Sequence, residues 1–164
     1  MTFGEVLLFL HILLAILAFG PTFAFPLIGA AGGKEPQHGN FALRVSEVIE
    51  KRLVIPAAVL LPLVGTWLIF DRSWDLWASE WLWISILIYV AAFSYSVTIQ
   101  RTTLDRLIEM TKNPPPSSEG ASAGPPPEMQ RLAKRMQIGG MVLSLAFVTI
   151  LLLMVWKPGG AIVP

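Results

Sequence analysis

Four apolar runs, each about as long as a lipid bilayer is thick, constrain this chain more than any other feature. The hydrocarbon core of a bilayer is roughly 30 Å across, so an α-helix rising about 1.5 Å per residue needs about 20 apolar residues to cross it. Runs of this kind cover about residues 4–31, 53–70, 81–99 and 138–156. In lipid a helix pairs its own backbone groups, whereas an isolated strand does not. We therefore expect an all-α fold, a four-helix transmembrane bundle that forms one membrane domain over residues 1–164.

The composition agrees with lipid as the solvent. Of the 164 residues 54% are hydrophobic and only 14% are charged, whereas about 25% of residues are charged in soluble domains. The net charge of +1 offers no strongly basic surface to a nucleic acid. The absence of cysteine excludes disulfides and thiolate metal sites. Because the first run carries Glu5 instead of a basic segment and is longer than the apolar part of a signal peptide, we expect it to be retained as a helix.

The basic residues predict how the helices are oriented. They gather in the connections after the first and third runs: Lys34, Arg44, Lys51, Arg52, Arg101, Arg106, Lys112, Arg131, Lys134 and Arg135. The opposite side has only Arg72 and Lys157. By the positive-inside rule both connections are cytoplasmic, which places both termini on the outer, periplasmic side of a bacterial inner membrane. Indole rings favour the headgroup level, and a predicted aromatic belt marks the outer helix ends: Trp74, Trp77, Trp81, Trp83 and Trp156.

Helices two to four are expected to extend into the cytoplasm. Asn40 is a candidate N-cap for a helix that runs into the second span, and Pro114 is expected to end the extension of the third. The stretch of about residues 113–127 is rich in Pro, Ser and Gly, which predicts a flexible linker. A proline favours the first position of a helix, so the next helix is expected to begin near Pro127 or Glu128.

His11 is the sharpest candidate for a functional residue, because it is the only histidine inside a predicted span. Small residues share its helical face, which therefore is expected to point into the bundle: Ala15, Ala18, Thr22, Pro26 and Gly29. Two interpretations remain open. The imidazole is either a structural histidine bonded to a hydroxyl at its depth, for which we consider Thr66, Tyr89 and Thr149, or an axial ligand of b-type haem with Met141 or Met154 opposite. His38 is expected in a solvated loop.

Other spans carry polar or irregular features. The third has a polar stripe, interpreted as packing contacts or as the wall of a polar path: Ser85, Tyr89, Ala92, Ser96, Gln100 and Thr103. The fourth continues it with Gln137, Gly140 and Ser144. Pro56 and Pro62 interrupt the second span and free backbone carbonyls, which favours a kink or a cavity.

Arginines gather at the inner ends of the second and third helices: Arg44, Arg52, Arg101 and Arg106. They either anchor the helices or hold an anion, such as lipid phosphates, haem propionates or a substrate carboxylate. Zinc-protease, serine-hydrolase and phosphate-loop motifs are absent, and no span contains paired carboxylates. Whether the protein is an enzyme stays open.

A resemblance adds to these predictions. It rests on three segments that cover most of the chain: LLFLHILLAILAFG, EKRLVIPAAVLLPLVGTWLI and WLWISILIYVAAFSYSVTIQRTTLDRL. Their order resembles an uncharacterised family of small bacterial four-helix membrane proteins. That family looks like a distant relative of copper-resistance D-type domains and J-type protoporphyrinogen oxidases, which are helical haem-binding membrane proteins. The resemblance implies that His11 is the haem-ligand position, whereas the lysine of the oxidase pattern is missing from residues 81–100, which counts against porphyrinogen oxidation.

Three functions follow as hypotheses. The first is a haem b protein or a binder of a related hydrophobic cofactor, with an accessory redox role. The second is a structural or assembly subunit that packs on a membrane partner or on a second copy of the chain. The third is a small transporter or copper-handling protein, which the lack of acidic residues within the spans disfavours.

Overall fold

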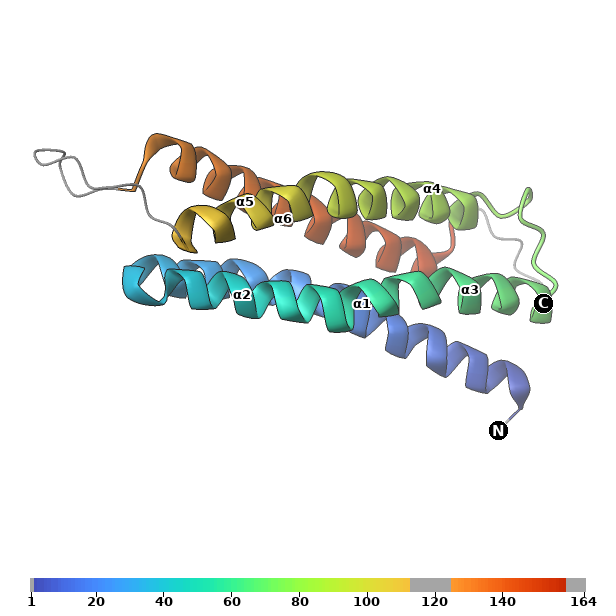
Figure 1. The fold of residues 1–164 in the computed structure, drawn as a ribbon. Coiled ribbons are helices and arrows are strands. Elements are labelled where there is room, and N and C mark those ends of the chain that lie inside the picture. The colour runs from blue at the N-terminus through green and yellow to red at the C-terminus, as the bar shows by residue number, and fades with distance from the viewer. Residues whose placement is uncertain (1, 113–124, 159–164) are drawn as a thin grey trace, which may run out of the picture.

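Four long helical rods run along one another through the molecule (Figure 1). The computed structural model describes residues 2–112 and 125–158. The rods comprise Phe3–Lys34, Gly39–Asp71, Glu80–Lys112 and Pro127–Trp156, all long and apolar enough to cross a membrane, and the residues described include no strand. The predicted all-α architecture with four candidate spans is thus confirmed. Most of the predicted linker, residues 113–124, lies outside the described part, and its last residue, Pro127, already belongs to a helix.

The second and third rods each consist of two α-helices joined by one wider, π-helical turn. The first and fourth rods are α1 (Phe3–Lys34) and α6 (Pro127–Trp156). The second contains α2 (Gly39–Ile49), a π turn (Glu50–Val54) and α3 (Ile55–Asp71). The third contains α4 (Glu80–Tyr95), a π turn (Ser96–Gln100) and α5 (Arg101–Lys112). A short 3₁₀ turn, Pro36–His38, connects α1 to α2.

The first π turn has a local cause in the sequence. It ends just before Pro56, whose ring in a regular α-helix would press on the carbonyl of Arg52 and which has no N–H to donate there. The Ile55 N–H instead donates to the carbonyl of Glu50, five residues back. The second π turn closes in the same way, from the Arg101 N–H to the Ser96 carbonyl. Both turns lie where the predicted spans pass into their extensions.

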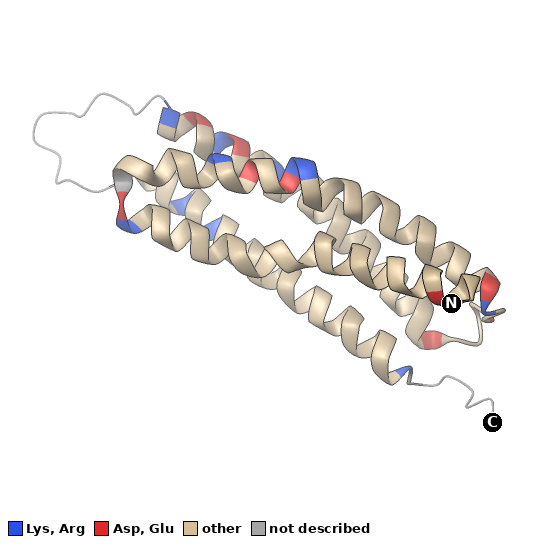
Figure 2. Ribbon diagram, turned by 90° about the horizontal axis from the view of Figure 1, so that it is seen from below, with Lys and Arg blue, Asp and Glu red and all other residues tan. Residues whose placement is uncertain are grey.

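The rods pair as two antiparallel hairpins. Helix α1 packs along α3 and α2, α6 packs along α4 and α5, and the hairpins meet through α1 with α6 and α2 with α5. The first residue of α1 and the last of α6 lie at the same end of the bundle (Figure 1). We call this the tryptophan end, and the opposite end, formed by α2, α5 and the start of α6, the basic end. Figure 2 shows most Lys and Arg residues towards the basic end and a middle section without charge.

Of the two predictions about where helices begin, one is confirmed and one is wrong. Helix α6 begins at Pro127, as expected. Asn40, however, does not cap α2, which already begins at Gly39. The Asn40 side chain is therefore free to reach α5, where its amide donates to the Ile108 carbonyl at 3.2 Å and to the Thr111 hydroxyl at 2.9 Å. This polar contact ties the two extensions together at the basic end.

Small and polar side chains let the helices approach closely. Ala18, Ala57 and Ala58 form a buried cluster between α1 and α3. The small-residue face of α1 thus points inward near its centre, but Pro26 and Gly29 are exposed, contrary to prediction. The polar stripe of the third rod does face the interior, since Ser85 is 1% and Thr103 is 3% exposed.

Candidate functional site

His11 packs directly against α3 at Gly65. A Cβ atom placed on Gly65 would lie only 3.0 Å from the His11 Cε1 atom and 3.3 Å from Nδ1, so the ring occupies the space that the missing side chain leaves. The Nδ1 atom is buried and has no hydrogen-bond partner. Since buried polar atoms are nearly always paired, an unpaired imidazole nitrogen inside the bundle is the main chemical anomaly of this site.

None of the three hydroxyls predicted as partners bonds to that nitrogen. Thr66 is at the depth of His11 because it follows Gly65, but its hydroxyl donates to the Pro62 carbonyl at 2.8 Å. Thr149 donates to the Leu145 carbonyl at 2.9 Å. A threonine hydroxyl in a helix readily bonds the carbonyl of the preceding turn, which removes it as a donor to another helix. These hydroxyls are therefore not the partners of a structural histidine, whereas the backbone of Leu61 does interact with the imidazole.

Tyr89 lies farther from the tryptophan end than predicted, and its hydroxyl bonds a partner other than His11. Its ring contacts Phe19 edge to face, with centroids 6.1 Å apart. Phe19 is eight residues beyond His11, about 12 Å along the helix. The Tyr89 hydroxyl donates to the carbonyl of Ala58. That carbonyl is the one that Pro62, lacking an N–H, leaves without its helical partner. The predicted effect of the proline, a freed carbonyl, is present and is satisfied from α4.

The two candidate methionines lie at different depths. Phe19 of α1 stacks on Phe147 of α6 with centroids 4.5 Å apart, which aligns the two antiparallel helices. Met154 is seven residues from Phe147 on the side of His11, so it lies near the depth of the imidazole. Met141 is on the other side, roughly 21 Å from His11 along the bundle, and is 54% exposed. Met141 is thus not placed to share a ligand with His11.

The predicted arginines are not part of the His11 site. Arg52 precedes Gly65 by 13 residues and Arg44 by 21, which corresponds to roughly 20 Å and 32 Å along the rod. Both side chains are exposed at the basic end. A single cofactor on His11 therefore cannot have its acidic groups held by Arg44 or Arg52.

A cavity of about 570 Å³ opens near the tryptophan end, one turn from Gly65. It is lined mainly by apolar side chains from α3, the following loop and α4: Thr66, Ile69, Phe70, Ser73, Trp74, Leu76 and Ile86. The Lys157 ammonium lies 4.7 Å from the centre of the Trp74 ring and 5.5 Å from that of Trp81. This cation–π contact ties the end of α6 to the wall of the cavity. Trp81 is only 3% exposed, so it belongs to the core and not to the predicted belt.

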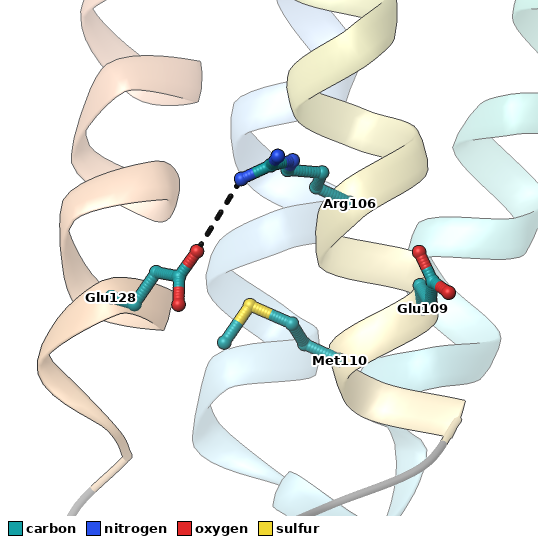
Figure 3. Close-up of a pocket in the computed structure, with 4 residues that line it drawn as sticks. All are labelled: Arg106, Glu109, Met110 and Glu128. Carbon is teal, nitrogen blue, oxygen red and sulfur yellow. Dashed lines mark ion pairs between the residues drawn. The ribbon is translucent and has the colours of Figure 1, made fainter.

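A second pocket, of about 360 Å³, lies at the basic end between α5 and α6 (Figure 3). Figure 3 shows Met110 and Arg106 directed towards α6, where Arg106 meets Glu128 with 3.6 Å between the charged atoms. Glu109 completes the lining. Both members of the ion pair are exposed, so it contributes about 1 kcal/mol at most. Because a carboxylate already faces Arg106, this pocket does not resemble a site for an anion.

Glu50 is the notable titratable group at the basic end, outside the predicted spans. Burial raises the pKa of Glu50 above its ordinary value of 4.5, against the opposing charge of Arg101 and with a further contribution from Asp105. Arg101 and Asp105 belong to α5, so the two π turns lie at a similar level in the bundle.

We expect the raised pKa of Glu50 to make the protein less stable as the pH rises. The folded state holds the proton more tightly than the unfolded state, so this contribution is complete below pH 4.5 and is lost as the pH passes through the raised pKa. Glu50→Gln cannot ionise, so it removes this loss of stability and is expected to raise the melting temperature at neutral pH. Thermal melts in detergent across this pH range measure the effect. Glu109→Gln, which changes an exposed carboxylate that is not among the groups acting on Glu50, is the control. Equal pH profiles for wild type and Glu50→Gln would contradict the prediction.

The partners in some contacts of the site could not be predicted from the sequence. Gly65 is a single glycine in an apolar helix and Gly139 is the first of a Gly-Gly pair, patterns that indicate close approach but not the partner. A Cβ on Gly139 would collide with the Gln100 amide oxygen and the Tyr95 hydroxyl. The buried neighbour of the polar stripe is therefore Gly139, whereas the predicted Gln137 is exposed.

The fold and the composition of its helices define an integral membrane protein with four candidate spans. Residues 5–158 match the family described as predicted integral membrane protein (DUF2269), and the chain belongs to that family. No curated protein and no solved structure matches the sequence. Within the residues described, no group of three or more His, Asp or Glu side chains is placed to hold a metal ion.

Proposed function

We propose that this integral membrane protein binds a hydrophobic cofactor, b-type haem, through His11 and serves as an accessory redox subunit. The observation that carries the proposal is the buried Nδ1 atom of His11, which has no hydrogen-bond partner. Leaving such an atom unpaired costs about 1–3 kcal/mol, and a ligand that engages the imidazole offsets this cost. The resemblance to helical haem-binding membrane proteins points to the same residue.

The imidazole of His11 would hold the haem iron, and a second side chain near its depth could hold it as well. Thr66, the hydroxyl nearest in depth, is bonded to its own helix and so does not compete for the imidazole. Met154 on α6 lies at a similar depth and carries a thioether, which is a known axial ligand of haem iron. When bound, haem would supply one-electron transfer, while the protein would hold it and exclude water. The stacked rings of Phe19 and Phe147 join α1 to α6 on the side of His11 that faces the basic end.

The test is an absorption spectrum of the full chain purified in detergent from cells supplied with haem. We expect a Soret band in the wild type, its loss in His11→Ala, and a shifted spectrum with weaker haem retention in Met154→Leu. Met141→Leu is the matched control, because Met141 is far from His11, and its spectrum is expected to equal that of the wild type. A colourless wild-type protein, or an unchanged band in His11→Ala, would overturn the proposal.

A further inference from the structure

Three cations on α6 form an exposed basic face, which we call the α6 basic face: Arg131, Lys134 and Arg135. Their spacing of three and four residues places them on one side of the helix. The other side of α6 faces the bundle, since Leu132 and Met136 are half-buried there and the Met136 carbonyl accepts a hydrogen bond from Gln100 at 2.9 Å. The α6 basic face thus points away from the protein, and Lys and Arg residues are visible along this part of α6 in Figure 2.

Like several other cations at the basic end, those of the α6 basic face have no acidic partner among residues 2–112 and 125–158. Lys51 pairs with Glu47, and Arg106 pairs with Glu128. None of the three residues of the α6 basic face forms an ion pair with a described carboxylate. Arg131 and Arg135 are also like charges four residues apart, a spacing that destabilises a helix unless an anion lies between them.

The depth of the α6 basic face matches a lipid headgroup layer. The apolar run of α6 begins at Ile138, so Arg135 lies about 5 Å and Arg131 about 10 Å outside it. The headgroup layer of a bilayer extends roughly 5–8 Å beyond the hydrocarbon core. Lipid phosphates are therefore within reach of long side chains on this face, and a guanidinium binds a phosphate through two parallel hydrogen bonds.

We propose that the α6 basic face is a binding site for anionic phospholipid headgroups, with Arg131 and Arg135 each holding a phosphate. Their Cβ atoms are about 5–6 Å apart, as for any pair four residues apart on a helix, so a lipid with two phosphates in its headgroup engages both. Lys134 adds a third charge between them. The proposal concerns a different end of the molecule from His11 and does not depend on the proposed function.

Native mass spectrometry of the full chain in detergent tests this site, with phosphatidylglycerol, cardiolipin and phosphatidylcholine as probes. The wild type is expected to retain cardiolipin best and phosphatidylcholine least. Each basic residue near a charged membrane surface contributes to the binding of anionic lipid. Removing both arginines, in Arg131→Gln/Arg135→Gln, is therefore expected to weaken cardiolipin binding about 30-fold. Arg131→Lys/Arg135→Lys keeps the charges but not the two parallel hydrogen bonds of each guanidinium. This variant is expected to lose less cardiolipin binding than the glutamine variant.

The matched control is Lys34→Gln/Lys112→Gln, which removes two exposed cations from the same end of the bundle. It is expected to bind cardiolipin as the wild type does. Inorganic phosphate, added as a competitor, is expected not to displace the lipid. Equal losses in the two double variants, equal binding of phosphatidylcholine and cardiolipin, or displacement by inorganic phosphate would each overturn the assignment of a lipid site to this face.

Discussion

Replacing Gly139 with alanine is expected to lower the free energy of unfolding by about 3 kcal/mol. The new methyl group would lie closer to the Gln100 amide oxygen and the Tyr95 hydroxyl than van der Waals contact allows. Gln100 cannot move away without cost, because its amide nitrogen donates to the Met136 carbonyl and its oxygen is already buried without a partner. Either that bond breaks or α6 moves away from α4, and both outcomes destabilise the second hairpin.

The neighbouring residue provides the control for Gly139→Ala. A Cβ on Gly140 would meet its nearest atom, the Gln100 amide nitrogen, at 4.0 Å, which is ordinary contact. Gly140→Ala is thus expected to leave stability unchanged or to raise it slightly, since alanine favours helix over glycine by about 1 kcal/mol. Equilibrium unfolding in mixed detergent micelles measures both variants. Equal stabilities for the two would show that the α6 contact is not as tight as described.

Tyr89→Phe is expected to destabilise the protein by about 1–3 kcal/mol. The variant keeps the ring and its contacts with Phe19 but removes the hydroxyl that donates to the Ala58 carbonyl. Because Pro62 has no N–H, the carbonyl then has no helical donor either, and in the bundle interior no water replaces it.

A second change separates this hydrogen bond from other effects of Tyr89→Phe. Pro62→Ala restores an N–H that can donate to the Ala58 carbonyl within α3. In that background Tyr89→Phe is expected to cost less, with a coupling free energy of about 1 kcal/mol between the two positions. Unfolding of the four proteins of the double-mutant cycle measures the coupling. Strictly additive effects would refute the assignment of the Tyr89 hydroxyl to the carbonyl that proline leaves unpaired.

The spans were predictable because the length of an apolar run follows from bilayer thickness and helix rise alone. The relative depths of side chains on different helices were not. Counting inward from helix ends placed Tyr89 beside His11, whereas the contact between Phe19 and Tyr89 places it about two turns deeper. Such an alignment depends on which side chains stack between helices, and one helix's sequence does not contain that information.

The candidate site, too, was predictable from the sequence only in part. A histidine in an apolar run is visible in the sequence and indicates a buried imidazole. Its contact with Gly65 depends on how α1 and α3 align, and the separation of Arg52 from His11 follows only once that contact is known. Asn40 was misjudged because its residue type fits a helix cap, while the start of α2 at Gly39 frees it for α5.

The two π turns also determine where this chain tolerates a change in length. A π turn holds one residue more than an α turn. Deleting one residue from Ser96–Gln100 therefore leaves a regular helix whose flanking segments keep their orientation, whereas in Glu50–Val54 the ring of Pro56 opposes a regular turn. The same deletion in the middle of α3 would rotate everything beyond it by about 100° and turn the Gly65 side of the helix away from α1. The third rod thus has one place where it can shorten while the surfaces that hold its neighbours stay aligned.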